Sequence, residues 1–229
     1  VISKDKKIVE TIKNNDAIVF YNLRSDRGRQ LAKCFVQPDF NKMNPGSFKR
    51  KKVMKNIKFV AMTDFGPDLG NILTAYPSED LKDTLPMVLK DIRQLYISES
   101  EKFAHVTYFF NGGYADHVNG ESRLMIPSPN VRSYAEKPAM SIVAMTLELT
   151  KYIQADAFEF ICVNYPNPDM VGHTGNLKAG IEAVEIVDQH LGLLYNEIRK
   201  KNGTLVIVSD HGNIEEMIDL KTNEIDTEH

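Results

Sequence analysis

Five side chains of the kinds that bind metal ions lie in the last third of this 229-residue chain. They are Asp169 and His173 in PDMVGH, Asp210 and His211 in SDHGN, and the terminal His229. Carboxylate oxygen combined with imidazole nitrogen suits manganese or zinc better than calcium, and no cysteine is offered. Five such ligands exceed the needs of one tetrahedral site. They favour two divalent cations, an arrangement that commonly polarises phosphoryl groups.

Two short apolar runs rich in β-branched residues precede these motifs. ICVNY (161–165) leads into the first, and TLVIVS (204–209) leads into the second. The segment 176–201 between them has an apolar stripe at helical spacing, which predicts a crossover helix. Because a right-handed βαβ unit brings the carboxyl ends of its strands to one sheet edge, we expect both motifs there. The alternative for either motif alone is a turn that caps a helix.

Strand and helix patterns alternate along the whole chain. This alternation favours α/β layers around a mostly parallel sheet. Further strands are predicted at 16–23, 58–63 and 105–111, and further helices at 27–35, 81–97 and 140–154.

Charged residues that could bind a phosphorylated substrate occur in two other places. LRSDRGR, after the first predicted strand, sets Arg24, Arg27 and Arg29 around Asp26. Guanidinium groups suit bidentate recognition of phosphate and carboxylate. The alternative is an exposed helix start whose charges pair with one another. Lys102, in SESEK ahead of the predicted strand at 105–111, is either a contact to a phosphoryl oxygen or a solvated loop charge.

The composition excludes several classes of function. With 28 Lys and Arg against 31 Asp and Glu, the formal net charge of -3 argues against nucleic acid as a partner. The basic run KRKKVMK (49–55) is short and is predicted to be a solvated loop. No apolar stretch is long enough to cross a bilayer, and the first residues lack the apolar core of a signal peptide. We therefore expect no membrane association and a cytoplasmic location.

Five segments together resemble the cofactor-independent phosphoglycerate mutases of the alkaline phosphatase superfamily, in order and in spacing. They are FYNLRSDRGRQ, SESEKFAHVTYFFNGG, EKPAMS, NYPNPDMVGHTG and VSDHGN. SDHGN alone would indicate only the wider superfamily. The resemblance implies an α/β fold with an alkaline phosphatase-like, mostly parallel sheet flanked by helices. Residues 76–229 would be the second segment of the metal-binding phosphatase domain, truncated at its C-terminus, and residues 1–75 the end of a second α/β (transferase) domain.

The resemblance also implies an activity and its cofactors. The family interconverts 3-phosphoglycerate and 2-phosphoglycerate, a step of glycolysis and gluconeogenesis, through a phosphoserine intermediate. It uses two Mn²⁺ ions, with Mg²⁺, Co²⁺ or Zn²⁺ as alternatives, and does not require 2,3-bisphosphoglycerate. By the family's motifs, Asp169, His173 and His229 would hold one ion, and Asp210 and His211 would hold the other.

The resemblance also implies roles for three cationic residues. Arg24 and Arg27 would bind the phosphate or carboxylate of the substrate, and Lys102 would contact the transferring phosphoryl group. No serine of this chain matches the motif of the nucleophile, which in the family lies N-terminal to the region represented here. We therefore expect a fragment that is inactive alone, from an enzyme that is monomeric when complete. The alternatives are another metal-dependent phosphatase or phosphomutase of the superfamily, and a non-catalytic metal-binding fragment.

Overall fold

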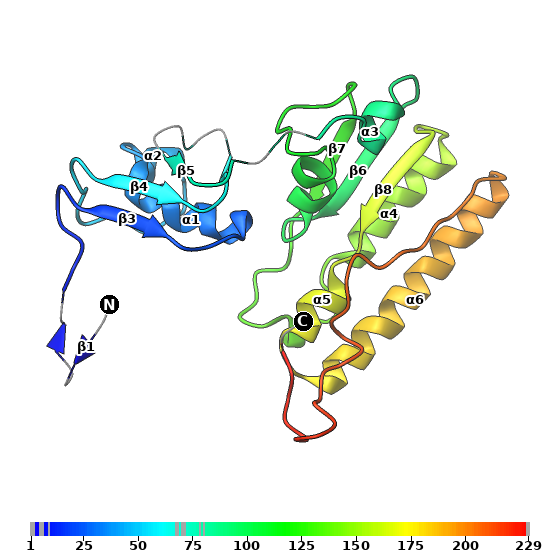
Figure 1. Cartoon of the computed structure of the whole chain (residues 1–229). Coiled ribbons are helices and arrows are strands. Elements are labelled where there is room, and N and C mark those ends of the chain that lie inside the picture. The colour runs from blue at the N-terminus through cyan, green and yellow to red at the C-terminus, as the bar shows by residue number, and fades with distance from the viewer. Residues whose placement is uncertain are drawn as a thin grey trace. The chain divides into compact units, whose positions relative to one another are not determined.

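The computed structural model describes residues 3–4, 7–8, 10–66, 69, 72–77, 79 and 81–227, with the side chains of 3–4, 7–8 and 25–27 left out. The chain divides into two compact units, Val1–Glu79 and Asp80–His229, each described by itself (Figure 1). No helix among the described residues is long and apolar enough to cross a membrane.

The first unit contains a three-stranded parallel sheet in the order β3-β4-β5. Its strands are β3 (Ala17–Phe20), β4 (Lys58–Ala61) and β5 (Leu73–Thr74), and its helices are α1 (Ser25–Val36) and α2 (Phe40–Met43). A separate antiparallel pair is formed by β1 (Ser3–Lys4) and β2 (Lys7–Ile8). The core joins Ala32 of α1 to Phe59 and Phe65, and the ring of Phe20 meets both phenyl rings edge-on at 5.8 and 5.7 Å.

Arg50, in the basic run, has a structural role in this unit. Its guanidinium donates to the carbonyls of Cys34, Gln37 and Pro38 at 3.0, 2.9 and 2.6 Å. These carbonyls lie at or just beyond the end of α1, where backbone acceptors have no helical partners. The neighbouring Lys49, Lys51, Lys52 and Lys55 are exposed, as predicted for a solvated loop. Arg50 is therefore the exception in that loop.

The second unit also contains a three-stranded parallel sheet, in the order β7-β6-β8. Its strands are β6 (Gln94–Glu99), β7 (Ser122–Ile126) and β8 (Phe160–Asn164). Its helices are α3 (Leu85–Val88), the π-helix η1 (His105–Phe109), the 3-10 helix η2 (Tyr134–Glu136), α4 (Ile142–Gln154), α5 (Asn167–Gly172) and α6 (Leu177–Lys200). The prediction of parallel sheets flanked by helices is thus confirmed.

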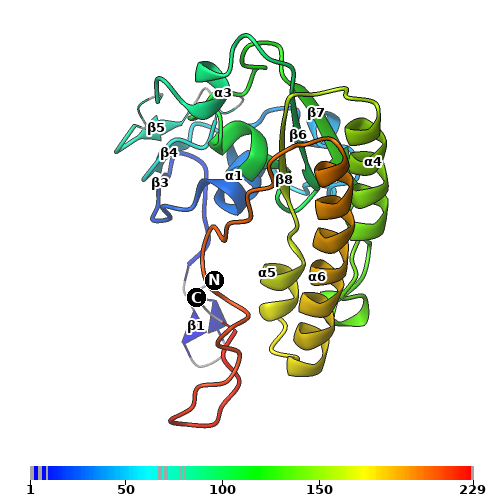
Figure 2. The same cartoon turned by 90° about the vertical axis from the view of Figure 1, so that its right-hand side faces the viewer.

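Helices α4 and α6 pack together against the sheet of this unit. They lie side by side in both views (Figures 1 and 2), and the core combines Met145 and Leu149 of α4, Leu194 of α6 and Ile97 of β6. The C-terminal part of the apolar stripe of 176–201, with Leu194 and Ile198, packs in this core, whereas Ile181 and Val184 of the same stripe are 54% and 44% exposed. Asn176 begins α6 as its N-cap, because its side-chain oxygen accepts from the Ala179 N–H at 3.1 Å.

Three of the predicted elements are wrong. The predicted helix at 81–97 is instead the short helix α3 followed by the central strand β6, whose Leu95, Tyr96 and Ile97 are at most 2% exposed. A strand buried on both faces shows no polar alternation, so its apolar run also fits a helical pattern. The predicted strand at 105–111 is largely η1, despite its β-branched and aromatic residues. Here tertiary packing overrides local strand propensity.

The predicted strand at 204–209 is also wrong for the residues that the structure describes. This segment has no helix and no strand pairing, and Val206 and Val208 are 75% and 82% exposed. Helix α6 therefore does not cross over to another strand of the described sheet. Strand pairing therefore does not position the SDHGN segment, and its position depends on side-chain contacts.

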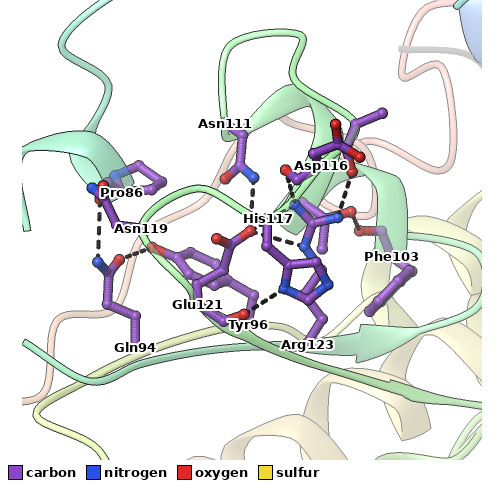
Figure 3. A network of polar contacts seen from close by, with 12 residues as sticks. Pro86, Gln94, Tyr96, Phe103, Asn111, Asp116, His117, Asn119, Glu121 and Arg123 are labelled. Carbon is purple, nitrogen blue, oxygen red and sulfur yellow. Dashed lines mark hydrogen bonds and ion pairs between the residues drawn. The ribbon is translucent and has the colours of Figure 1, made fainter. Parts of the chain in front are cut away.

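A polar network fixes the loop that enters β7 (Figure 3). The Glu121 carboxylate is buried and accepts from Asn111 Nδ2 at 2.9 Å and from the Arg123 guanidinium at 2.6 Å. Arg123 also donates to the carbonyls of Ala115 and Asp116, both at 2.8 Å. The buried ion pair of Glu121 with Arg123 thus anchors the loop between η1 and β7 at the start of that strand.

Candidate metal and phosphoryl site

Two adjacent parallel strands bring the candidate site together. β6 and β8 pair with Ser98 opposite Asn164, so their carboxyl ends lie at the same edge of the sheet. Lys102 follows the end of β6, and Asp169 lies in α5, which follows β8. Lys102 was expected ahead of a strand, but it follows one. This correction brings Lys102 to the edge where open α/β sheets bind ligands.

Lys102 and Asp169 form a buried ion pair. Nζ of Lys102 lies 2.5 Å from Oδ2 of Asp169, and the two side chains are only 6% and 14% exposed. Burial raises the pKa of the Asp169 carboxyl, but the hydrogen bonds from Lys102 and Asn213 and the charge of Lys102 together hold the pKa below its usual value. The site therefore keeps an ionised carboxylate beside an ammonium group.

His173 completes a compact cluster with these two residues. It is the C-cap of α5, four residues after Asp169, and its Nε2 lies 3.2 Å from Oδ1 of Asp169. Its Nδ1 contacts the carbonyl oxygen of Thr227 at 2.8 Å. A carbonyl can only accept, so Nδ1 donates to Thr227 and Nε2 is the nitrogen that faces the Asp169 carboxylate.

Asp210 and His211 form a second pair of the same kind. Nδ1 of His211 contacts the Gly212 carbonyl at 3.0 Å, and Nε2 lies 3.8 Å from Oδ1 of Asp210. The side chain of Asp210 is 56% exposed and that of His211 is 32% exposed. In both pairs a backbone carbonyl fixes the ring, and the other nitrogen is beside a carboxylate oxygen.

Asn213 is the residue that sequence reasoning missed. Its Nδ2 donates to Oδ1 of Asp169 at 2.8 Å, which joins the SDHGN segment to α5. Met217, 3% exposed, and Ile214 hold the same segment against the two helices, with Ile214 beside Val171 and Ala179. Asp210 is three residues from Asn213, so their Cα atoms are at most about 10 Å apart. A partner 44 residues away in sequence leaves no local signal, and only the motif itself pointed to this region.

The donor chemistry of these two pairs fits divalent cations. In the first pair Nε2 of His173 and a carboxylate oxygen of Asp169 are 3.2 Å apart, so either a shared proton or a bound cation can join these two atoms. Two ligands that each bind an ion at about 2.1 Å lie about this far apart. Among the described residues no group of three or more His, Cys, Asp or Glu side chains gathers to hold an ion. His229 lies outside the described residues.

A second carboxylate is buried near the site. Glu99, at the end of β6, is 0% exposed, and its Oε1 accepts from the Ser141 N–H at 2.9 Å. Burial raises the pKa of Glu99 above its usual value. This contact ties the EKPAMS segment and the start of α4 to the strand that leads to Lys102.

The candidate arginines belong to the first unit. Arg24 is the exposed N-cap of α1, and its backbone N–H donates to Oδ1 of Asn22 at 2.8 Å. The side chains of Asp26 and Arg27 lie outside those described. Arg29 lies against Gly66, with a guanidinium nitrogen 3.1 Å from where a Cβ would be. The predicted helix start at this motif is confirmed, and its predicted substrate contacts stay predictions.

Comparisons with known proteins give the class of protein. The Metalloenzyme superfamily model matches residues 42–229, and the model for the BPG-independent PGAM N-terminus matches residues 1–67. The 2,3-bisphosphoglycerate-independent phosphoglycerate mutase of Clostridium novyi is 44% identical over 231 residues, covering 100% of this chain and 44% of the relative. The 2,3-bisphosphoglycerate-independent phosphoglycerate mutase 1 of Methanosarcina acetivorans is 42% identical, again covering 100% of this chain and 44% of the relative.

A solved structure agrees with these matches. The structure of Leishmania mexicana phosphoglycerate mutase at low cobalt concentration has a TM-score of 0.85 and 32% identity, covering 98% of this chain and 41% of that one. The chain therefore belongs to the Metalloenzyme superfamily and, within it, to the family of cofactor-independent phosphoglycerate mutases. The family resemblance and the fold class expected from the sequence are confirmed. The chain spans less than half the length of these relatives.

Proposed function

We propose that this chain supplies part of the active site of an enzyme that interconverts 3-phosphoglycerate and 2-phosphoglycerate without 2,3-bisphosphoglycerate. The buried ion pair of Lys102 with Asp169, together with the adjoining and more exposed His173 at the carboxyl edge of the sheet, carries this proposal. The names of the relatives support the reaction and the independence from 2,3-bisphosphoglycerate. In this proposal residues 1–75 belong to the transferase domain and residues 76–229 to the phosphatase domain.

The proposed metal ligands are two carboxylate and imidazole pairs. Asp169 and His173, with His229, would hold one divalent cation, and Asp210 and His211 would hold the other. Manganese is the ion we propose, with cobalt as an alternative because the Leishmania structure is named for cobalt. Bound divalent cations would polarise the phosphoryl oxygens and offset their charge.

The chain's own residues would position the substrate and stabilise its charge. Lys102 has three N–H donors, and the ion pair with Asp169 leaves the others able to reach a phosphoryl oxygen. This arrangement places a fixed positive charge where the transferring group gathers negative charge. Arg24 and Arg27 would bind the phosphate or carboxylate of the glycerate, with the phosphoserine formed on a serine outside this chain.

Substrate binding by Arg24 separates a mutase from a simple phosphatase. A protein of the relatives' full length that contains this chain should lose mutase activity on Arg24→Ala, while hydrolysis of a small phosphate ester persists. The exposed Lys42→Ala is a matched control for the lost charge. Mutase activity unchanged by Arg24→Ala would show that Arg24 does not bind the substrate. Hydrolysis with no mutase activity in the parent protein would replace the proposal by the phosphatase alternative.

A further inference from the structure

A buried amide joins the two motifs that carry the proposed metal ligands. Nδ2 of Asn213 donates to Oδ1 of Asp169 at 2.8 Å and approaches the Asp169 carbonyl oxygen at 3.4 Å. Asn213 is 8% exposed, so water competes little for this contact. One side chain of the SDHGN segment therefore contacts both the backbone and the carboxylate of α5.

The two oxygens of Asp169 have different partners. Oδ2 faces Nζ of Lys102, and Oδ1 faces both Nδ2 of Asn213 and Nε2 of His173. Rotation of the carboxylate would break contacts to donors on separate segments of the chain. The amide is uncharged, so it can orient the carboxylate without neutralising it. The oxygen beside His173 therefore keeps its charge.

We propose that Asn213 is a positioning residue that fixes the Asp169 carboxylate for cation binding. This inference rests on the proposed function, in which Asp169 is a metal ligand. Groups that hydrogen-bond to a metal ligand orient it, and their loss typically costs about 10- to 100-fold in metal affinity. Asn213 has this relation to Asp169, as the Thr227 carbonyl has to His173.

Gly172 offers a second substitution that tests the proposal without changing Asn213 itself. A Cβ at Gly172 would lie 2.3 Å from Oδ1 and 3.0 Å from Cγ of Asn213. Gly172 is the last residue of α5 and does not have a positive φ, so its backbone conformation does not demand glycine. The Asn213 side chain would have to move to admit a Cβ at this position. Gly172→Ala should therefore displace the amide while leaving Asn213 in the sequence.

The test is a double-mutant cycle on Mn²⁺ affinity, measured by isothermal titration of the full-length protein. We expect Asn213→Ala and Gly172→Ala each to weaken the ion at Asp169 about 10- to 100-fold. In an Asp169→Asn background, Asn213→Ala should add little, because its target is already changed. Asn196→Ala, an exposed asparagine of α6, is the control and should leave the affinity unchanged.

Each outcome decides the inference. An unchanged affinity in Asn213→Ala, or the same loss in both backgrounds, overturns the positioning role and leaves the proposed function standing. An unchanged affinity in Asp169→Asn overturns the proposed function and the inference with it. Should Asn213→Ala fail to fold, Gly172→Ala carries the test.

Discussion

Nζ of Lys102 lies 2.5 Å from Oδ2 of Asp169, although the two residues follow different strands and are 67 positions apart. The parallel pairing of β6 with β8 produces this contact. Because both side chains are largely buried, neither charge can be removed without leaving the other unpaired in a poorly solvated place.

Lys102→Met tests how much this ion pair contributes to the stability of the fold. We expect a loss of about 3 kcal/mol in the free energy of unfolding, because the substitution strands a buried carboxylate. Urea unfolding measures it. Adding Asp169→Asn to Lys102→Met should recover part of the loss, since the unpaired charge disappears. The exposed Lys178→Met is the control, and equal losses from the two lysine substitutions would contradict the assignment.

Glu99 and Asp169 should give opposite dependences of stability on pH. The lowered pKa of Asp169 means that its contribution is present above its unfolded pKa and is lost as pH falls through the folded pKa. The raised pKa of Glu99 reverses this, so its burial favours folding at low pH and opposes it as pH rises.

The variant Glu99→Gln isolates the second effect. It keeps an oxygen for the Ser141 N–H but removes the titrating charge. Unfolding at several pH values should show Glu99→Gln more stable than wild type near pH 8, with the difference vanishing below about pH 4. Glu182→Gln, an exposed glutamate of α6, should show no such trend. A difference independent of pH would contradict the burial of an ionised Glu99.

Arg50 should stabilise the first unit through the end of α1. Arg50→Met removes three hydrogen bonds from a charged donor, and we expect a loss of about 2 kcal/mol. Hydrogen exchange of the α1 amides would localise the loss. Lys51→Met, at the exposed neighbouring position, should change stability by less than about 0.5 kcal/mol. Equal effects of the two substitutions would show that the carbonyl contacts are not stabilising.

Segments with clear hydrophobic periodicity or a short apolar run predicted several helices and strands correctly. Contacts between residues far apart in the sequence could not be predicted from such local patterns. The stripe of 176–201 gave α6, and the apolar runs near 58 and 161 gave β4 and β8. The central strand β6 was missed because burial on both faces removes its alternation.

The candidate site was likewise predictable in its residue types but not in its tertiary contacts. Residue types pointed to Asp169, His173, Asp210 and His211, and the structure pairs them two by two. Their connection through Asn213, and the ion pair of Asp169 with Lys102, depend on tertiary contacts that no local pattern encodes.

The exposed apolar run at 204–208 should make this chain self-associate. Val206, Ile207 and Val208 are 75%, 63% and 82% exposed, and an exposed apolar, β-branched segment without strand partners among the described residues can pair with another chain. Sedimentation velocity should show association that rises with concentration. Val206→Lys with Val208→Lys should reduce it, whereas Leu220→Lys, at a site 93% exposed, should not. A wild-type chain that stays monomeric at high concentration would contradict this prediction.

The most direct test of the proposed site is anomalous diffraction at the manganese edge from crystals of the full-length protein grown with Mn²⁺. We predict one peak within about 2.2 Å of both the Asp169 carboxylate and Nε2 of His173, and a second beside Asp210 and His211. Manganese bound only elsewhere, with Asp169 still paired to Lys102 and no ion at His173, would contradict the account.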